Sequence, residues 1–121
     1  MLSWPPGMLR QGRVFTYEEA LSLFPVVRDR TSAAVRELEA LVSQASRGED
    51  EGTESSALES AYREVVERWA AEIESLGCHV KGLWLVDWDS GDGYFCWKHP
   101  EPALAHFHGY DEGFAGRVPI T

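Results

Sequence analysis

The sequence has few cysteines, few basic residues and no long apolar run. Cys78 and Cys96 are the only cysteines among 121 residues, too few for a metal-thiolate cage on their own or for a secreted disulfide framework. No apolar run approaches the roughly 20 residues that a membrane span needs. The first residues show neither a charged n-region nor an unbroken apolar h-region, so we do not expect a signal peptide. These features predict a cytoplasmic protein with reduced thiols and no membrane partner.

Basic residues number 11 against 20 acidic ones, which gives a formal net charge of −9. Affinity for a phosphate backbone depends on Lys and Arg side chains that release counterions. The sequence therefore argues against nucleic acid as a partner. The composition is otherwise that of an ordinary folded protein, although five Trp side chains must be accommodated in a core or at an interface.

An irregular arm and a long helix open the chain. Proline and glycine within residues 1–14 are incompatible with a helix. Thr16 and Glu19 have the spacing of a capping box, which starts a helix. Apolar positions from Leu21 to Val42 then recur at spacings of three, four and seven, so they lie on one stripe. Pro25 interrupts this stripe without changing its phase and predicts a kink rather than a break.

A second helix follows an acidic loop over residues 47–53. It begins near Ser55 or Ser56, with Glu59 placed to close another capping box, and it ends before Gly77. Its apolar positions form a near-heptad seam that is too short for an independent coiled coil. We therefore expect the two helices to pack antiparallel, and the pair to rest on the C-terminal half, on a second copy, or on both.

Beyond residue 77 the apolar period changes to two, which is typical of strands. Residues 83–88 and 94–97 are rich in strand formers and are separated by a turn at residues 90–93, so they predict a β-hairpin. Residues 103–108 can form a third strand.

The order of these patterns predicts the α+β class. We expect an N-terminal antiparallel helical hairpin (residues 16–76), with a kinked first helix, packed on a small antiparallel sheet of about three strands (residues 77–121). The chain then comprises the irregular arm (residues 1–14) and a single α+β domain (residues 15–121).

An ordered series of residues spans nearly the whole chain after residue 14: Phe15, Thr16, Glu19, Ala20, Pro25, Gly77, Cys78, Lys81, Leu85, Val86, Asp87, Cys96, Trp97, Glu101, His108, Gly113, Phe114, Ala115 and Arg117. With this series the chain resembles a family of small bacterial proteins, the domain of unknown function DUF2203. That family shows a Phe-Thr-x-x-Glu-Ala opening, a helix pair, and then Gly-Cys-x-x-Lys, Leu-Val-Asp-Phe, Cys-Trp, Glu, Trp-His and Gly-Phe-Ala-x-Arg. Trp88, Phe107 and the His99-Pro100 pair depart from this pattern. The resemblance supplies no activity that can be assigned to the chain.

A polar series runs through these matches: Asp87, Glu101, His108 and Arg117. Asp87 lies in an otherwise apolar strand, where an ionised carboxylate needs a partner. Arg117 can bind a carboxylate through both arms of its guanidinium and is the natural candidate. The face that Asp87 occupies depends on the strand register, which places it opposite Cys96 or, with one more residue in the turn, opposite Phe95.

Alternative chemistry in this region has weaker support. His106 and His108 point to one side of a strand and could bind a metal with Glu101 or Asp87, although we expect neither a metal nor a cofactor. A nucleophilic pair of Cys96 and His108 is disfavoured, because apolar burial raises the pKa of a thiol.

Two hypotheses for function remain. The first is a non-catalytic interaction or structural module that self-associates through its helical hairpin, as a homodimer or with an unidentified protein partner. The second is a small-ligand or metal site, open to an enzymatic role, built from Asp87, Glu101, His108 and Arg117. The sequence specifies no ligand, reaction or pathway.

Overall fold

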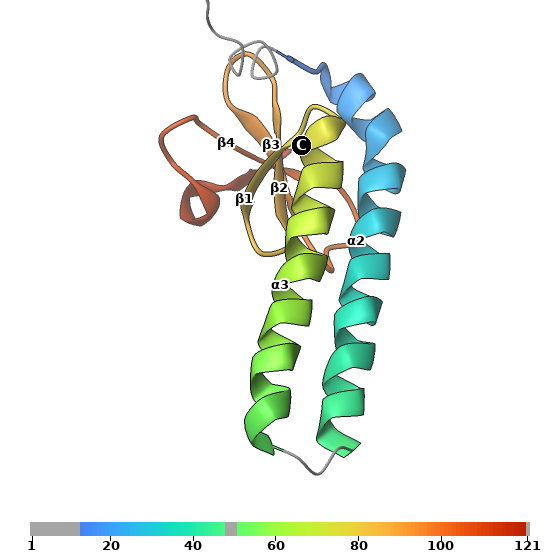
Figure 1. Cartoon of the computed structure of the whole chain (residues 1–121). Helices are drawn as coiled ribbons and strands as arrows, with labels where there is room; N and C mark the ends of the chain where they lie inside the picture. The colour runs from blue at the N-terminus through green and yellow to red at the C-terminus, as the bar shows by residue number, and fades with distance from the viewer. Residues whose placement is uncertain (1–12, 48–50, 121) are drawn as a thin grey trace, which may run out of the picture.

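A helical hairpin packs on an antiparallel sheet (Figure 1). The computed structural model describes residues 13–47 and 51–120. Helices α2 (Tyr17–Arg47) and α3 (Glu51–Ser75) lie side by side and antiparallel. The sheet covers the part of the hairpin that holds the start of α2 and the end of α3, while the connecting end of the hairpin projects beyond the sheet. The α+β class predicted from the sequence is confirmed.

Two predictions concern residues that the structure leaves undescribed. Residues 1–12 of the expected irregular arm lie outside the described chain, and so do residues 48–50 of the expected acidic loop.

The start of α2 forms the predicted capping box. The backbone N–H of Thr16 donates to Glu19 Oε1 at 2.9 Å, and the N–H of Glu19 donates to Thr16 Oγ1 at 3.0 Å. These two bonds satisfy donors that have no partner within the helix. The helix then continues through Pro25 as one element, so the proline does not split it.

Helix α3 begins earlier than expected, at Glu51 rather than at Ser55 or Ser56. Gly52 and Thr53 have low helix propensity and therefore favoured a loop, but such weak preferences are readily overridden by the tertiary context. The end of the helix is as predicted, because Gly77 follows the last turn with a φ of 97°.

The sheet has five strands in sequential order, rather than about three. The three predicted strands are present, although the last of them starts at His106 instead of residue 103. The two additional strands lie at the two edges of the sheet, where short strands with few apolar residues give little sequence signal. The strands are β1 (His79–Gly82), β2 (Leu85–Asp89), β3 (Tyr94–Lys98), β4 (His106–His108) and β5 (Val118–Pro119).

The main core lies between the sheet and the helices. Val86, Trp88 and Trp97 are fully buried there. The Phe24 ring of α2 contacts both tryptophans, with centroid distances of 6.5 Å to Trp88 and 5.4 Å to Trp97. The aromatic side chains of β2 and β3 thus fix which face of the sheet the helices cover.

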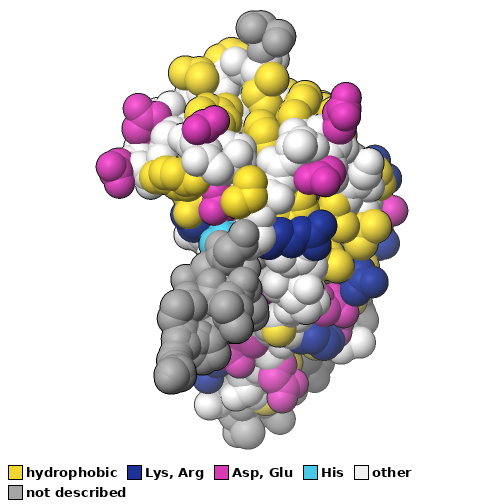
Figure 2. Space-filling view, turned by 90° about the horizontal axis from the view of Figure 1, so that it is seen from above, with side chains coloured by type: hydrophobic (Ala, Val, Ile, Leu, Met, Phe, Trp, Pro, Cys, Tyr) yellow, Lys and Arg dark blue, Asp and Glu magenta, His cyan; other side chains and the backbone are white. Residues whose placement is uncertain are grey.

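The surface agrees with the acidic composition. On the face seen in Figure 2, acidic and hydrophobic side chains are interspersed, and the basic side chains lie in separate places. Within the part of the chain that the structure describes, no helix combines the length and the apolar character that crossing a membrane requires.

Candidate functional site

The strand register places a polar group on the sheet face that points away from the helices. Asp87 pairs with Cys96, and Cys96 pairs with His106 on the next strand. Because side chains alternate along a strand, Asp87 lies opposite in direction to its buried neighbours Val86 and Trp88. Of the two registers that the sequence left open, the structure has the one with Asp87 beside Cys96.

Asp87 and His108 form the centre of this group. His108 Nε2 lies 2.8 Å from Asp87 Oδ2, and the two side chains are only 3% and 1% exposed. Lys81 Nζ lies 3.7 Å from the same carboxylate oxygen. The second oxygen, Oδ1, is buried and has no hydrogen-bond partner among the described residues. Asp87 is therefore a buried carboxylate with one oxygen, Oδ1, that can still accept a hydrogen bond or bind a cation.

The other ring nitrogen fixes the tautomer of His108. Nδ1 lies 2.7 Å from the carbonyl oxygen of Gly109. A carbonyl oxygen can only accept, so Nδ1 must carry the hydrogen. Neutral His108 consequently presents the lone pair of Nε2 to the Asp87 carboxylate. A proton or another cation has to lie between these two acceptors for the contact to be favourable.

Glu101 and Arg117 form a second pair beside the first. The guanidinium donates to both carboxylate oxygens, at 3.0 and 2.7 Å, and Glu101 Oε1 also accepts from the backbone N–H of Lys98. Burial raises the pKa of Glu101, but the hydrogen bonds and the charge of Arg117 outweigh this effect, so the pKa lies below its usual value.

The expected partner of Arg117 was Asp87, and this expectation is wrong. Arg117 directly precedes β5, at the edge of the sheet, whereas Asp87 is on β2, three strand positions away. Glu101 follows β3 and is the carboxylate within reach.

Cys96 links the two pairs and is the site residue to which sequence reasoning gave too little weight. Arg117 Nη1 lies 3.9 Å from its Sγ, and ligand atoms of Asp87, Cys96 and His108 all lie within 4.8 Å of one another. Burial, followed by the Asp87 carboxylate, raises the pKa of the fully buried Cys96 thiol to about 12. The free thiol is therefore a poor nucleophile, although a metal could still displace its proton.

The alternative metal site predicted from His106, His108 and Glu101 differs from the set of ligand atoms that converges in the structure. Within the described residues, the group of ligand atoms that converges is that of Asp87, Cys96 and His108. Both oxygens of Glu101 are engaged by Arg117. His106 lies opposite Cys96, and its buried Nδ1 lacks a hydrogen-bond partner among the described residues.

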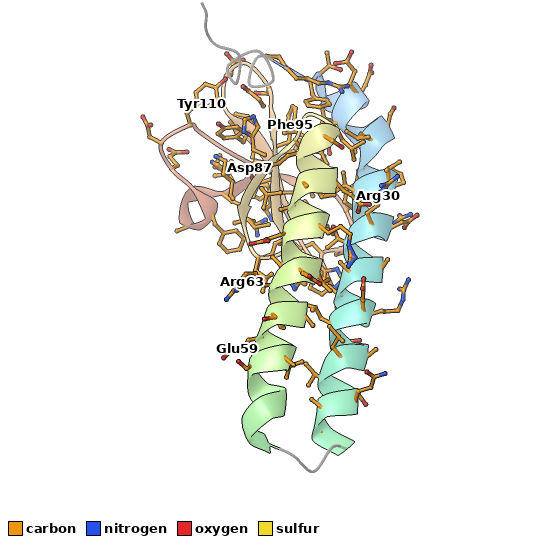
Figure 3. All side chains as sticks on the ribbon, viewed as in Figure 1. Arg30, Glu59, Arg63, Asp87, Phe95 and Tyr110 are labelled. Carbon is orange, nitrogen blue, oxygen red and sulfur yellow. The ribbon has the colours of Figure 1, made fainter. Side chains whose placement is uncertain are left out.

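Aromatic rings surround the polar group. The Tyr94 ring lies 5.4 Å from His108 and 5.1 Å from Tyr110, and Lys81 Nζ sits 3.9 Å above the Tyr94 ring. The Arg117 guanidinium stacks on Phe114 at 4.1 Å. Asp87 and Tyr110 are labelled in Figure 3, which shows both on the sheet side of the molecule.

A second candidate region is the hairpin groove, an open apolar hollow of about 840 Å³ between the projecting part of the hairpin and the β1–β2 turn. Tyr62 and the turn residue Leu83 are 38% and 43% exposed there. Figure 3 shows Glu59 and Arg63 on α3, below the sheet. The lining residues are Val42, Leu58, Glu59, Tyr62, Arg63, Val66, Glu67 and Leu83.

Fold and site together define a class: a small α+β protein with a helical hairpin on a five-stranded sheet and a buried polar network on the outer sheet face. Residues 13–120 match the family described as "Uncharacterized conserved protein (DUF2203)". The chain belongs to this family, which confirms the resemblance found in the sequence. Searches of curated proteins and of solved structures gave no match.

Proposed function

We propose that the protein is an interaction module in which two copies associate through the hairpin groove. The observation that carries this proposal is that the hairpin projects beyond the sheet while Val42 and Tyr62 stay exposed and Leu58 and Val66 are half-buried. Leu58, Tyr62 and Val66 follow one another at intervals of four on α3, so they form a ridge of the kind that packs into the groove of another helix.

The charges beside this ridge favour a second copy as the occupant. Arg63 lies one turn from Glu59 on one side and from Glu67 on the other. In an antiparallel pair of α3 helices whose two-fold axis passes between Glu59 and Arg63, each Arg63 faces Glu59 of the second copy, and the contact occurs twice. A surface with this pattern is complementary to itself.

Light scattering coupled to size exclusion tests the proposal on the full chain. The wild type is expected to be a dimer, and Arg63→Glu is expected to be monomeric because every charge along the contact becomes negative. The matched control reverses all three charges: Glu59→Arg, Arg63→Glu and Glu67→Arg together restore complementarity and should restore the dimer. A monomeric wild type at every concentration overturns the proposal. So does an Arg63→Glu variant that stays dimeric.

A second candidate function is a small-ligand or metal site on the outer sheet face, built from Asp87, Glu101, His108 and Arg117. It is favoured by the meeting of the two pairs around Cys96 on one face. Elemental analysis and native mass spectrometry of protein purified without an affinity tag test it, because they report a bound ion or a bound organic molecule.

A further inference from the structure

We propose that Asp87, Cys96 and His108 bind a divalent transition-metal ion of the zinc type, with one coordination position left for water or a ligand. This inference rests on the second candidate function and narrows it. It also changes the residues of that site, because Cys96 becomes a metal ligand while Glu101 and Arg117 do not coordinate the metal.

His108 is already oriented as a metal ligand. A histidine that binds a metal through one nitrogen usually donates the other N–H to a carbonyl or a carboxylate, which fixes the tautomer and the ring. His108 does this through Nδ1 and the Gly109 carbonyl at 2.7 Å. The free lone pair on Nε2 points toward Asp87 Oδ2.

Asp87 supplies an acceptor that the protein itself leaves unused. Its Oδ1 is buried without a hydrogen-bond partner among the described residues, and burying such an atom without a partner is costly. A cation chelated by both oxygens of Asp87 would interact with Oδ1, Oδ2 and the His108 lone pair together. A proton between Nε2 and Oδ2 satisfies those two atoms but leaves Oδ1 as it is.

The separations between the three ligand atoms must change by about 1 Å or less to surround an ion. Ligand atoms in a tetrahedral zinc site lie roughly 3.4–3.8 Å apart, given metal–ligand bonds of about 2.0–2.3 Å. The three ligand atoms here lie within 4.8 Å of one another. The close contact of 2.8 Å between Nε2 and Oδ2 must widen by about half an ångström to admit the ion.

The donor set selects the class of metal. One imidazole, one thiol and one carboxylate suit zinc and its neighbours, whereas calcium and magnesium prefer oxygen ligands alone. Binding releases the proton of the Cys96 thiol to solvent and forms a metal–sulfur bond. Two anionic ligands then balance the double charge of the ion. Arg117, 3.9 Å from Sγ, can donate to the resulting thiolate.

Cobalt(II) is the probe for the experiment, because its thiolate charge-transfer absorption reports a cobalt–sulfur bond directly. Full-length, tag-free protein stripped with a chelator is titrated with cobalt, and zinc is then added as a competitor. We expect one equivalent to bind with a charge-transfer band that zinc abolishes. Cys96→Ser should lose the band, and His108→Gln should weaken binding more than about 100-fold, since even outer partners of a ligand contribute 10–100-fold.

Two control variants make the result specific. Cys78→Ser removes the other buried thiol and should leave the band unchanged, and His106→Ala should leave the affinity unchanged. Circular dichroism establishes that each variant is folded. The inference is overturned if the wild type shows no band, if the band survives Cys96→Ser, or if His106→Ala abolishes binding.

The outcomes also separate this inference from the proposals on which it borders. A bound organic molecule in native mass spectra without cobalt binding overturns the metal centre and leaves the second candidate function standing. Protein that carries no bound molecule and binds no cobalt overturns both. The oligomeric state from light scattering is independent of each of these results.

Discussion

The Thr31 hydroxyl of α2 should stabilise the packing of the two helices through its hydrogen bond with Trp69 of α3. It is fully buried, donates to the Val27 carbonyl at 2.7 Å and accepts from Trp69 Nε1 at 2.9 Å. Thr31→Val replaces this hydroxyl with a methyl group of similar size. The change therefore removes both hydrogen bonds and creates no cavity, and it leaves the indole N–H of Trp69 buried without a partner.

The expected cost follows from these contacts. A buried donor left without a partner costs about 1–3 kcal/mol, and the added methyl group offsets about 0.8 kcal/mol. The free energy of unfolding should therefore fall by about 0.2–2 kcal/mol. Thr31→Ser keeps the hydroxyl and loses only a methyl group, which typically costs about 0.5–1.5 kcal/mol.

Urea unfolding monitored by Trp fluorescence measures both variants. With an m-value of about 2 kcal/mol per molar urea, the midpoint of Thr31→Val should fall by about 0.1–1 M. Protein concentration must be held fixed, because self-association would make the midpoint depend on it. Trp69→Phe removes the donor, so Thr31→Val should cost less in that background. An equal cost in both backgrounds would refute the role given to this hydrogen bond.

Three further changes test other parts of the molecule. Glu101→Gln should lower the free energy of unfolding at neutral pH. The folded-state pKa of Glu101 is depressed. The difference in free energy of unfolding between variant and wild type is therefore present above the unfolded pKa of about 4.3 and should vanish as the pH falls through the folded pKa. Urea titrations at a series of pH values measure this difference. Thr16→Ala should cost about 1 kcal/mol by loss of the cap to Glu19, and Thr16→Ser should cost much less in the same assay. Cys78 is buried, and burial raises its pKa to about 12 despite the nearby Arg13. A disulfide reagent at neutral pH should therefore label this thiol only as fast as the protein opens. Rapid labelling of native Cys96→Ser protein, in which Cys78 is the remaining cysteine, would contradict the burial of Cys78.

Local patterns in the sequence were sufficient to predict the helices and the central strands. The spacing of Thr16 and Glu19 specifies a cap whatever lies nearby, and the change of period after Gly77 marks the start of the sheet. The edge strands β1 and β5 could not be predicted in this way. Each is defined by pairing with one neighbour, and neither carries an alternating pattern long enough to be distinguished from a loop.

The sequence singled out Asp87, Glu101, His108 and Arg117 but did not predict their pairing, and their role as a binding site stays a prediction. The sequence indicated that Asp87 and Arg117 need oppositely charged partners, but the choice of partner depends on which strands are neighbours. Apolar burial was the reason for disfavouring Cys96 as a nucleophile, and Phe95 and Trp97 flank it in β3. The alternation of a strand carried the opposite signal, since a residue between two side chains on the helix side faces away from the helices.

The burial of this polar group is harder to explain by stability than the rest of the fold. The apolar side of the sheet packs on the helices through Val86, Trp88 and Trp97. On the other side, burying the Asp87–His108 pair carries a desolvation cost, and replacing a buried ion pair with apolar groups of similar size is often neutral or stabilising. A hydrogen bond between the two side chains still leaves Asp87 Oδ1 without a partner. A bound cation that engages Oδ1 would supply that partner, and this is the physical reason for proposing a metal ion at Asp87.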